Sequence, residues 1–295
     1  SPTMPALLLS RRNALRAAGL AAVAAPRLVA ATAAPARKPM RVSVQMYSVR
    51  DDCAKDFDAA LAAVAKMGFD GVEFAGYHGY RDRPAELQAR LADLNLVVAG
   101  THIPTAKLRG DELQRTIEFH QALGCPFLIV GGDGDFTHPE KSKALADTFN
   151  AAAERLGPAG MACGYHNHTK EFGKRDDGKT WWELFAERTS PEVILQQDVG
   201  WTVTAGLDPV QFIKKYPGRT RTTHFKPAAI TPDRRPILGQ DSVDWTAVIT
   251  ACRDVGGTEW MTVEQETYEK GRSPMECTAL SLAGLRKILA DLKPA

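Results

Sequence analysis

The sequence lacks several features that would point to particular classes of protein. Its most apolar stretch, an alanine-rich run before residue 34, is shorter than the roughly 20 residues that a membrane span needs, so we predict no stable membrane anchor. Its five cysteines (53, 125, 163, 252 and 277) lie far apart and show no C-x-x-C spacing. In a chain of this size we expect them to be buried as small hydrophobic residues, although two disulfides could form and their pairing is left open.

The first 40 residues differ from the rest of the chain. Paired arginines (Arg11 and Arg12) precede a weakly apolar run, and small residues follow around Ala33. This is the layout of a secretory signal, so we predict a signal peptide over residues 1–33, a linker over 34–40 and the folded body over 41–295. The segment resembles a twin-arginine signal, with Ala14 where a Phe is usual. The resemblance implies the twin-arginine export machinery as a partner and a periplasmic location; an amphipathic helix that belongs to the fold is the alternative.

Removal of this segment changes the charge of the protein. It carries four arginines and no acidic residue, so cleavage near Ala33 would change the formal net charge from +2 to −2. The body then offers no electrostatic basis for binding nucleic acid, and we predict none.

From residue 41 onward, short β-rich runs alternate with longer amphipathic ones. We predict helices between and after eight strands, over 41–47, 70–74, 96–100, 127–131, 161–166, 193–198, 219–225 and 259–264. Eight β-then-α units predict one α/β domain, a single (β/α)8 TIM barrel. An open doubly wound sheet would place a glycine-rich phosphate loop after its first strand, whereas this sequence has MYSVRDD there.

Polar side chains gather where the predicted strands end, which is where the active site of such a barrel lies. They are Gln45, Tyr47, Glu73, His102, His166, His168, Asp198, His224, Lys226, Glu264 and Glu266. Four of the seven histidines belong to this group. We expect the other three, His78, His120 and His138, on the surface.

Three of the strand ends carry pairs spaced i, i+2: His166 with His168, His224 with Lys226, and Glu264 with Glu266. Residues at this spacing point to the same side of an extended strand. Ionisable groups that converge in a barrel are costly to bury without a partner. A divalent cation is the simplest partner for such a set of imidazoles and carboxylates, and the set suits Mn²⁺, Zn²⁺, Co²⁺ or Fe²⁺. A structural network of ion pairs is the alternative.

At this point the sequence resembles a known family, the xylose isomerase-like barrels, which include the sugar phosphate isomerases/epimerases and the AP endonuclease family 2. The resemblance runs from VQMYSVRDD through GYHNHTKEF, LQQDVGW and THFKP to TVEQE. In that family one divalent metal is typically held by residues from four strands. Asp198, His224 and Glu264 match three of the ligands, and the resemblance implies that they bind metal.

The fourth ligand departs from the family pattern. The family usually reads E-N-H where this sequence reads H-N-H, so His166 stands at the place of a carboxylate. Either His166 binds the metal as a neutral imidazole, or Glu171 reaches in from the loop, or the affinity for metal is low. His166 can also orient a ligand without binding metal itself. The usual H-L-K-D reads H-F-K-P, so the carboxylate after Lys226 is missing.

The remaining residues at the strand ends are candidates for contacts with a substrate. We predict that His168, Tyr47, Glu73 and Trp201 contact it, and that Trp181 and Trp182 either line the sugar site or dock a helix on the core. The catalytic candidates are Glu266, Glu171 and His102 as proton acceptors and Lys226 as a group that neutralises developing negative charge. For His102 and His168, simple packing is the alternative.

This set of residues predicts metal-assisted proton transfer next to a carbonyl group. Proton return to the other face or the neighbouring carbon gives epimerisation or isomerisation, whereas loss of a β-leaving group gives a lyase or dehydratase. The family contains both outcomes. We expect an exported isomerase or epimerase of a keto-sugar; the alternatives are a lyase or hydratase acting on a 3-keto-glycoside or inosose and a non-catalytic sugar-binding protein. A nuclease on this fold would need three zinc ions and a basic groove. The oligomeric state, including a homo-oligomer, is left open.

Overall fold

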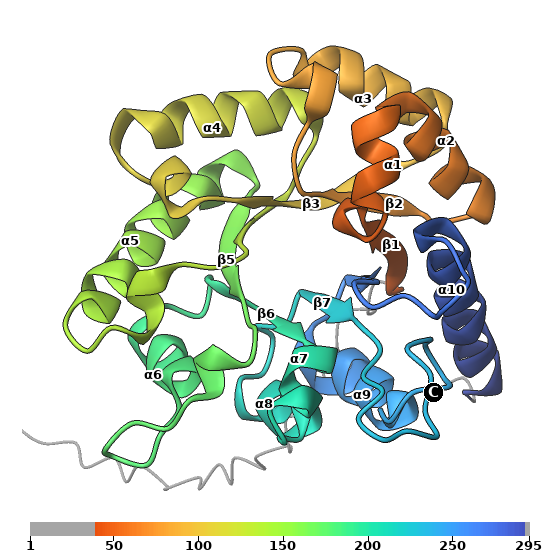
Figure 1. Ribbon diagram of the computed structural model, residues 1–295. Coiled ribbons are helices and arrows are strands. Elements are labelled where there is room, and N and C mark those ends of the chain that lie inside the picture. The colour runs from red at the N-terminus through yellow and green to blue at the C-terminus, as the bar shows by residue number, and fades with distance from the viewer. Residues whose placement is uncertain (1–38, 293–295) are drawn as a thin grey trace, which may run out of the picture. The chain divides into compact units, whose positions relative to one another are not determined.

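The computed structural model describes residues 39–292 and shows one closed barrel. Eight parallel strands pair in sequence order, and the last strand pairs with the first (Figure 1). The strands are β1 (Arg41–Gln45), β2 (Gly71–Phe74), β3 (Val97–Ile103), β4 (Phe127–Val130), β5 (Ala162–His166), β6 (Ile194–Asp198), β7 (Thr222–Phe225) and β8 (Trp260–Val263). The predicted (β/α)8 architecture is confirmed. The predicted signal peptide lies outside the described residues.

Helices follow the strands and surround the barrel (Figure 1). The α-helices are α1 (Arg50–Lys55), α2 (Phe57–Met67), α3 (Pro84–Asp93), α4 (Gly110–Leu123), α5 (Lys141–Leu156), α6 (Trp181–Arg188), α7 (Val199–Thr204), α8 (Pro209–Lys215), α9 (Trp245–Ala251) and α10 (Pro274–Asp291). Within the described residues, none of these helices is both long enough and apolar enough to cross a membrane.

Local capping explains where the predicted helices begin and end. Asp56 accepts a hydrogen bond from the backbone of Ala59 at the start of α2, and Gly68 ends that helix in the left-handed conformation. Thr180 with Glu183 forms a capping box on α6. Two six-residue helices, α1 and α7, were not predicted, because so short a segment contains too few turns to show an amphipathic period.

The interior of the barrel changes from apolar to ionisable along the strands. Side chains alternate between the two faces of a strand, so Ile194, Gln196 and Asp198 of β6 share one face. Ile194 belongs to a small buried cluster with Ala99, Phe127, Ile129, Ala162 and Trp260. A larger cluster of buried apolar residues contains residues of the other strands and of the surrounding helices. The ionisable strand ends therefore adjoin this small apolar cluster and the buried hydroxyls of Ser43, Thr222 and Thr262.

The five cysteines are all free and buried, as expected of small hydrophobic residues. The expectation for His120 is wrong: its side chain is buried on α4, with Nδ1 2.6 Å from the Thr116 carbonyl oxygen and Nε2 2.8 Å from the Tyr77 hydroxyl. Because both ring nitrogens have hydrogen-bond partners, burying this side chain leaves no polar atom of the ring unpaired. The first strand ends at Gln45 rather than at residue 47, because a 3-10 turn (Met46–Val49) follows it.

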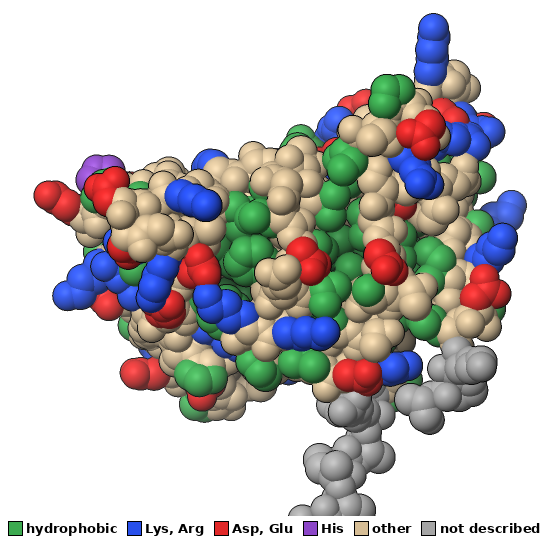
Figure 2. All heavy atoms as spheres, turned by 90° about the horizontal axis from the view of Figure 1, so that it is seen from below, with side chains coloured by type: hydrophobic (Ala, Val, Ile, Leu, Met, Phe, Trp, Pro, Cys, Tyr) green, Lys and Arg blue, Asp and Glu red, His purple; other side chains and the backbone are tan. Residues whose placement is uncertain are grey.

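The outer surface carries charges of both signs. On the face shown in Figure 2, acidic and basic side chains are interspersed, with hydrophobic side chains visible between them.

The long connection from β7 to α9 packs closely on α10. A Cβ atom at Gly284 would stand 2.0 Å from the carbonyl oxygen of Leu238. Alanine favours an isolated helix over glycine by about 1 kcal/mol. Here we expect Gly284→Ala to destabilise the fold instead, by about 1–3 kcal/mol, because the connection must move away. The melting temperature should fall by several degrees.

Gly157, at the end of α5, provides the matched control. It has right-handed backbone dihedrals, and a Cβ atom there meets nothing within 4 Å. Gly157→Ala should leave the melting temperature unchanged or raise it. Equal melting temperatures for the two variants would contradict the close packing of α10.

Candidate metal centre

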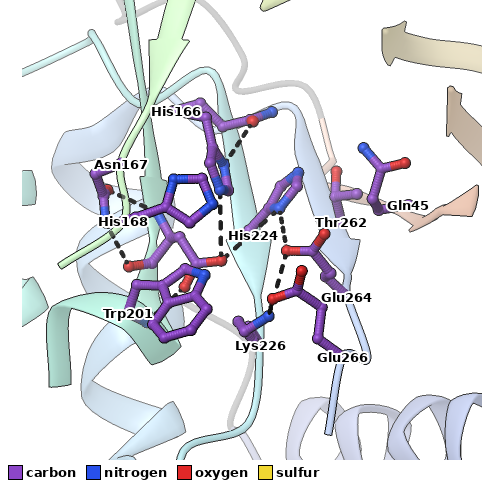
Figure 3. Close-up of polar contacts among 12 residues, drawn as sticks. Gln45, His166, Asn167, His168, Trp201, His224, Lys226, Thr262, Glu264 and Glu266 are labelled. Atoms are coloured by element: carbon purple, nitrogen blue, oxygen red, sulfur yellow. Dashed lines mark hydrogen bonds and ion pairs between the residues drawn. The ribbon is translucent and has the colours of Figure 1, made fainter. Parts of the chain in front are cut away.

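Four ionisable side chains converge at the ends of neighbouring strands. His166 and Asp198 are the last residues of β5 and β6. His224 lies in β7 and Glu264 follows β8, and Figure 3 labels these two together with His166. One ligand atom from each lies within 4.8 Å of the other three, and all four side chains are buried. The structure therefore brings together the four residues predicted to bind metal, and the group has the composition of a site for one cation.

The carboxylate of Asp198 has one satisfied and one unsatisfied oxygen. Oδ1 accepts a hydrogen bond of 2.7 Å from the backbone N–H of Trp201. Oδ2 is buried and has no hydrogen-bond partner among the described residues, although it lies 3.9 Å from both His166 Nε2 and His224 Nδ1. Burial raises the pKa of this carboxyl group to about 7. An orphaned buried oxygen between two imidazole nitrogens fits a bound cation, which would supply the missing partner.

The imidazole of His224 is oriented by carboxylates at both nitrogens. Its Nε2 lies 2.5 Å from Glu73 Oε1, whereas its Nδ1 lies 3.0 Å from Glu264 Oε2 and faces Asp198. Burial disfavours the charged ring, yet Glu73 and Glu264 raise its pKa to about 10. Nδ1 is the nitrogen that a cation between Asp198 and Glu264 would meet. In this arrangement Nδ1 carries a proton directed to Glu264, so the cation would have to displace that proton.

The amide of Gln196 orients the second imidazole. Its oxygen lies 3.1 Å from His166 Nδ1 and 2.8 Å from His102 Nε2, and its nitrogen donates to Glu73 Oε2 at 2.7 Å. Nε2 of His166 is therefore the nitrogen that faces Asp198. Burial holds the pKa of His166 well below its usual value, so this ring is neutral and has a lone pair for a cation.

Glu73 is fully buried, and protein donors occupy its carboxylate. Besides His224 and Gln196, it accepts from Gln45 Nε2 at 2.8 Å and lies 3.1 Å from His102 Nε2. Burial alone would raise the pKa of this carboxyl group, but His224 and His102 outweigh that effect and hold it well below its usual range. This arrangement indicates that Glu73 orients the side chains around it. Its predicted contact with substrate stays a prediction.

A second set of side chains lies beside Glu264. The Lys226 ammonium forms an ion pair with Glu266, lies 3.8 Å from Glu264 and stands 4.8 Å from the centre of the Trp201 ring. The ring of His168 is 4.9 Å from that of His166 and 5.7 Å from that of Trp201. These contacts place the predicted residues Lys226, Glu266, His168 and Trp201 next to the four-residue group (Figure 3).

Other predicted residues lie apart from this group or have other partners. Glu171 accepts from the backbone of His168 at 2.8 Å and from the hydroxyl of Tyr165 at 3.5 Å, and it is not among the clustered ligands. Trp182 is fully buried against Phe136 and Phe172, so it docks its helix on the core. Trp181 is partly buried beneath the Arg175 guanidinium, and Tyr47 is 42% exposed with Arg50 stacked on it.

Sequence reasoning missed Gln196 and Asn167. Gln196 lies two positions before Asp198 and hence on the same strand face, which is a usable signal. Asn167 carries no such signal. Its amide accepts from the backbone N–H of Asp198 at 2.9 Å and donates to the backbone oxygen of the same residue at 3.2 Å. This clamp continues the pairing of β5 with β6 beyond the last strand residue.

Comparison with known proteins agrees with this architecture. The family model described as "Xylose isomerase-like TIM barrel" matches residues 61–288. The protein belongs to this family of (β/α)8 barrels.

Individual relatives are distant. A curated inosose dehydratase from Geobacillus kaustophilus is 24% identical over 225 residues, which cover 68% of this chain and 71% of the relative. A solved sugar phosphate isomerase/epimerase from Parabacteroides distasonis is 24% identical with a TM-score of 0.73, over 84% of this chain and 98% of that one. A D-allulose 3-epimerase from Methylomonas sp. is 13% identical with a TM-score of 0.62, over 85% and 98%. At these identities the structural matches establish the fold.

The clamp made by Asn167 gives a test of the site's construction. Asn167→Ala leaves the buried backbone N–H of Asp198 unpaired, whereas the carbonyl oxygen of Asp198 still accepts from the Thr202 hydroxyl. We therefore expect a loss of about 1–3 kcal/mol in the free energy of unfolding, measured by chemical denaturation. Asn150→Ala removes a similar clamp between α5 and the end of α6, where Asn150 bonds the backbone of Arg188 and Ser190 in a partly buried setting. A larger loss for Asn150→Ala than for Asn167→Ala would contradict our reading of the site.

Proposed function

We propose that the protein is an enzyme that binds one divalent cation and transfers a proton next to a carbonyl group of a sugar. The observation that carries the proposal is the orphaned Oδ2 of Asp198, enclosed by His166, His224 and Glu264. The donors would be His166 Nε2, Asp198 Oδ2, His224 Nδ1 and the Glu264 carboxylate. Two nitrogen and two oxygen donors suit Mn²⁺, Zn²⁺, Co²⁺ or Fe²⁺. When bound, such a cation supplies Lewis-acid polarisation of the carbonyl oxygen.

The residues beside the cation site provide for the movement of a proton. Glu266 is partly exposed, with 25% of its side chain accessible, whereas Lys226 is almost fully buried. In the proposed reaction the Glu266 carboxylate takes the proton from the carbon next to the carbonyl. The Lys226 ammonium, paired with it, stabilises negative charge that develops on a sugar oxygen.

His102 offers a second proton-transfer group from a different strand. Its side chain is 19% exposed, and its ring stacks parallel to that of His224 at 5.3 Å. Glu73 and Gln196 hold its Nε2, which leaves Nδ1 as the nitrogen that can accept a proton. Two such groups on β3 and after β8 suit either epimerisation, with removal and return of a proton, or elimination, with one group as base and the other as acid.

We favour an isomerase or epimerase of an unphosphorylated keto-sugar, in line with the relatives that carry those names. The second candidate, a dehydratase or lyase acting through the same proton removal, is favoured by the inosose dehydratase relative. Export through the twin-arginine pathway remains part of the proposal.

The cation site predicts a measurable stoichiometry. Protein purified without chelator should contain about one divalent metal ion per chain by elemental analysis, and Asp198→Asn should lose at least about 90% of it, because the orphaned oxygen becomes a neutral amide atom. Asp208→Asn, at the cap of α8, is the control, since asparagine caps a helix equally well. Equal metal contents in the two variants would refute the site.

Adjacent glutamines test the orientation of the imidazoles. Gln196→Met removes the acceptor of His166 and should weaken Mn²⁺ or Zn²⁺ binding about 10–100-fold by calorimetric titration. Gln197 donates to Thr202 on the other side of the same strand, so Gln197→Met should retain affinity close to that of the wild type. If both variants bind metal like the wild type, Gln196 does not orient the site.

Proton transfer itself is tested by deuterium incorporation. A panel of keto-sugars and 3-keto-glycosides in heavy water should include a substrate that gains deuterium beside its carbonyl only when Mn²⁺ is present. Glu266→Gln should slow this exchange by about 10²–10⁴-fold with metal content unchanged. Appearance of an epimer or isomer identifies the first candidate, and appearance of an eliminated product the second. Loaded protein that exchanges no member of the panel would count against the proposal.

A further inference from the structure

A cavity of about 610 Å³ lies beside the candidate metal centre, between the segments that follow β2 and β3 and the helix α4. This volume is within the usual range for a small-molecule site. None of the four clustered residues that could hold a cation lines the cavity. The cavity is therefore separate from the place where a reacting sugar would meet the metal, and it has space for a further part of the substrate.

His102 lies on the boundary between this cavity and the metal centre. Its side chain is 19% exposed and lines the cavity. On the other side, its ring stacks on that of His224, one of the four clustered residues, at a distance of 5.3 Å between ring centres. A second unit attached to a sugar at the metal centre would therefore pass His102 to enter the cavity.

Two charged residues of the lining are available to a ligand. Arg81 and Asp82 both line the cavity and are exposed, and neither side chain has a hydrogen-bond or ion-pair partner within the described residues. The guanidinium only donates hydrogen bonds and the carboxylate only accepts them. A hydroxyl group can do both, so this pair suits neighbouring hydroxyls of a sugar ring, whereas a plain aromatic ring would leave both groups without a partner.

A second charged set comes from the segment after β3 and from α4. Lys107 and Arg115 both form ion pairs with Glu112, yet 48% and 65% of their side chains remain accessible. Since lysine carries three N–H donors and arginine five, both retain donors for a ligand. With Arg81 and Asp82, the lining holds three cations and two carboxylates. This near balance suits a neutral group with many hydroxyls better than a phosphate.

Two aromatic rings form an apolar part of the wall. The rings of Tyr77 and Phe119 lie 5.0 Å apart at an angle of 52°, so they contact each other and make one surface. The Tyr77 hydroxyl is 2.8 Å from both Thr101 Oγ1 and His120 Nε2, which fixes this ring. The C–H groups of a sugar can pack on such an aromatic surface while its hydroxyls reach the charged residues.

We propose that this cavity binds a second sugar unit, so that the substrate is a disaccharide. One unit reacts at the metal centre, and the other lies in the cavity, where Arg81 and Asp82 bind its hydroxyls. The assignment of the reacting unit rests on the proposed function, whereas the binding of the second unit can be measured without any turnover.

Probes that differ in the group attached to one glucose test the inference by calorimetric titration in the presence of Mn²⁺. They are methyl β-glucoside, phenyl β-glucoside and the disaccharides sophorose, laminaribiose, cellobiose and gentiobiose, which differ in linkage. At least one disaccharide should bind the wild-type protein at least about tenfold more tightly than the methyl and the phenyl compound do. This is the effect of two added hydrogen bonds, each of which contributes a factor of about 5.

Variants locate the effect. Arg81→Ala and Asp82→Ala should each weaken the binding of the preferred disaccharide by about fivefold or more and leave the binding of methyl β-glucoside unchanged. Arg109→Ala is the matched control. Arg109 is also an exposed arginine without a side-chain partner within the described residues, and it does not line the cavity. Melting temperatures check that each variant is folded.

The outcomes separate this inference from the proposed function. If no disaccharide binds more tightly than the methyl and phenyl compounds, or if Arg109→Ala acts like Arg81→Ala, the site for a second sugar unit is refuted even when deuterium exchange succeeds. If a disaccharide binds as expected and the two cavity variants weaken it, but no sugar exchanges deuterium, this site stands and the proposed reaction falls.

Discussion

The buried carboxylate of Glu73 is the group on which the arrangement of the site depends. It stands on β2, yet it fixes Nε2 of His224 on β7, contacts Nε2 of His102 on β3 and accepts from the amide of Gln196 on β6. A fully buried carboxylate is stable only when donors surround it, so the chain must bring these strands together in one register. The contacts of Glu73 across the barrel interior thus link β2 to β3, β6 and β7 and orient the imidazoles of His102 and His224.

His166, which stands where the resemblance led us to expect a carboxylate, fits this network. A neutral imidazole keeps a ligand nitrogen at the end of β5 while removing one negative charge from a buried group that already holds Asp198 and Glu264. Gln196, which is uncharged, accepts from His166 without adding a further carboxylate to Glu73, Asp198 and Glu264. A neutral imidazole at the end of β5 therefore limits the negative charge that is buried in this group.

The fold and the centre of the site were predictable because they depend on periodic signals. Strands and helices alternate with clear caps, and Asp198, His224 and Glu264 fall where parallel strands end. The orienting residues were harder to predict. Gln196 and Glu73 act through contacts between strands distant in sequence, and the Asn167 clamp follows from backbone geometry at a strand end. His120 looked like a surface residue because its partners, Tyr77 and the Thr116 carbonyl, are brought to it only by tertiary packing.

The residues of the candidate site come from two sides of the barrel, β5 to β8 on one and β2 and β3 on the other. The four residues that could hold a cation come from β5, β6, β7 and the position after β8, whereas Glu73 and His102 belong to β2 and β3. A substrate held between the sides would meet Lys226 and Glu266 from one and His102 from the other. Glu73 joins the two sides through its contacts with His224 and His102.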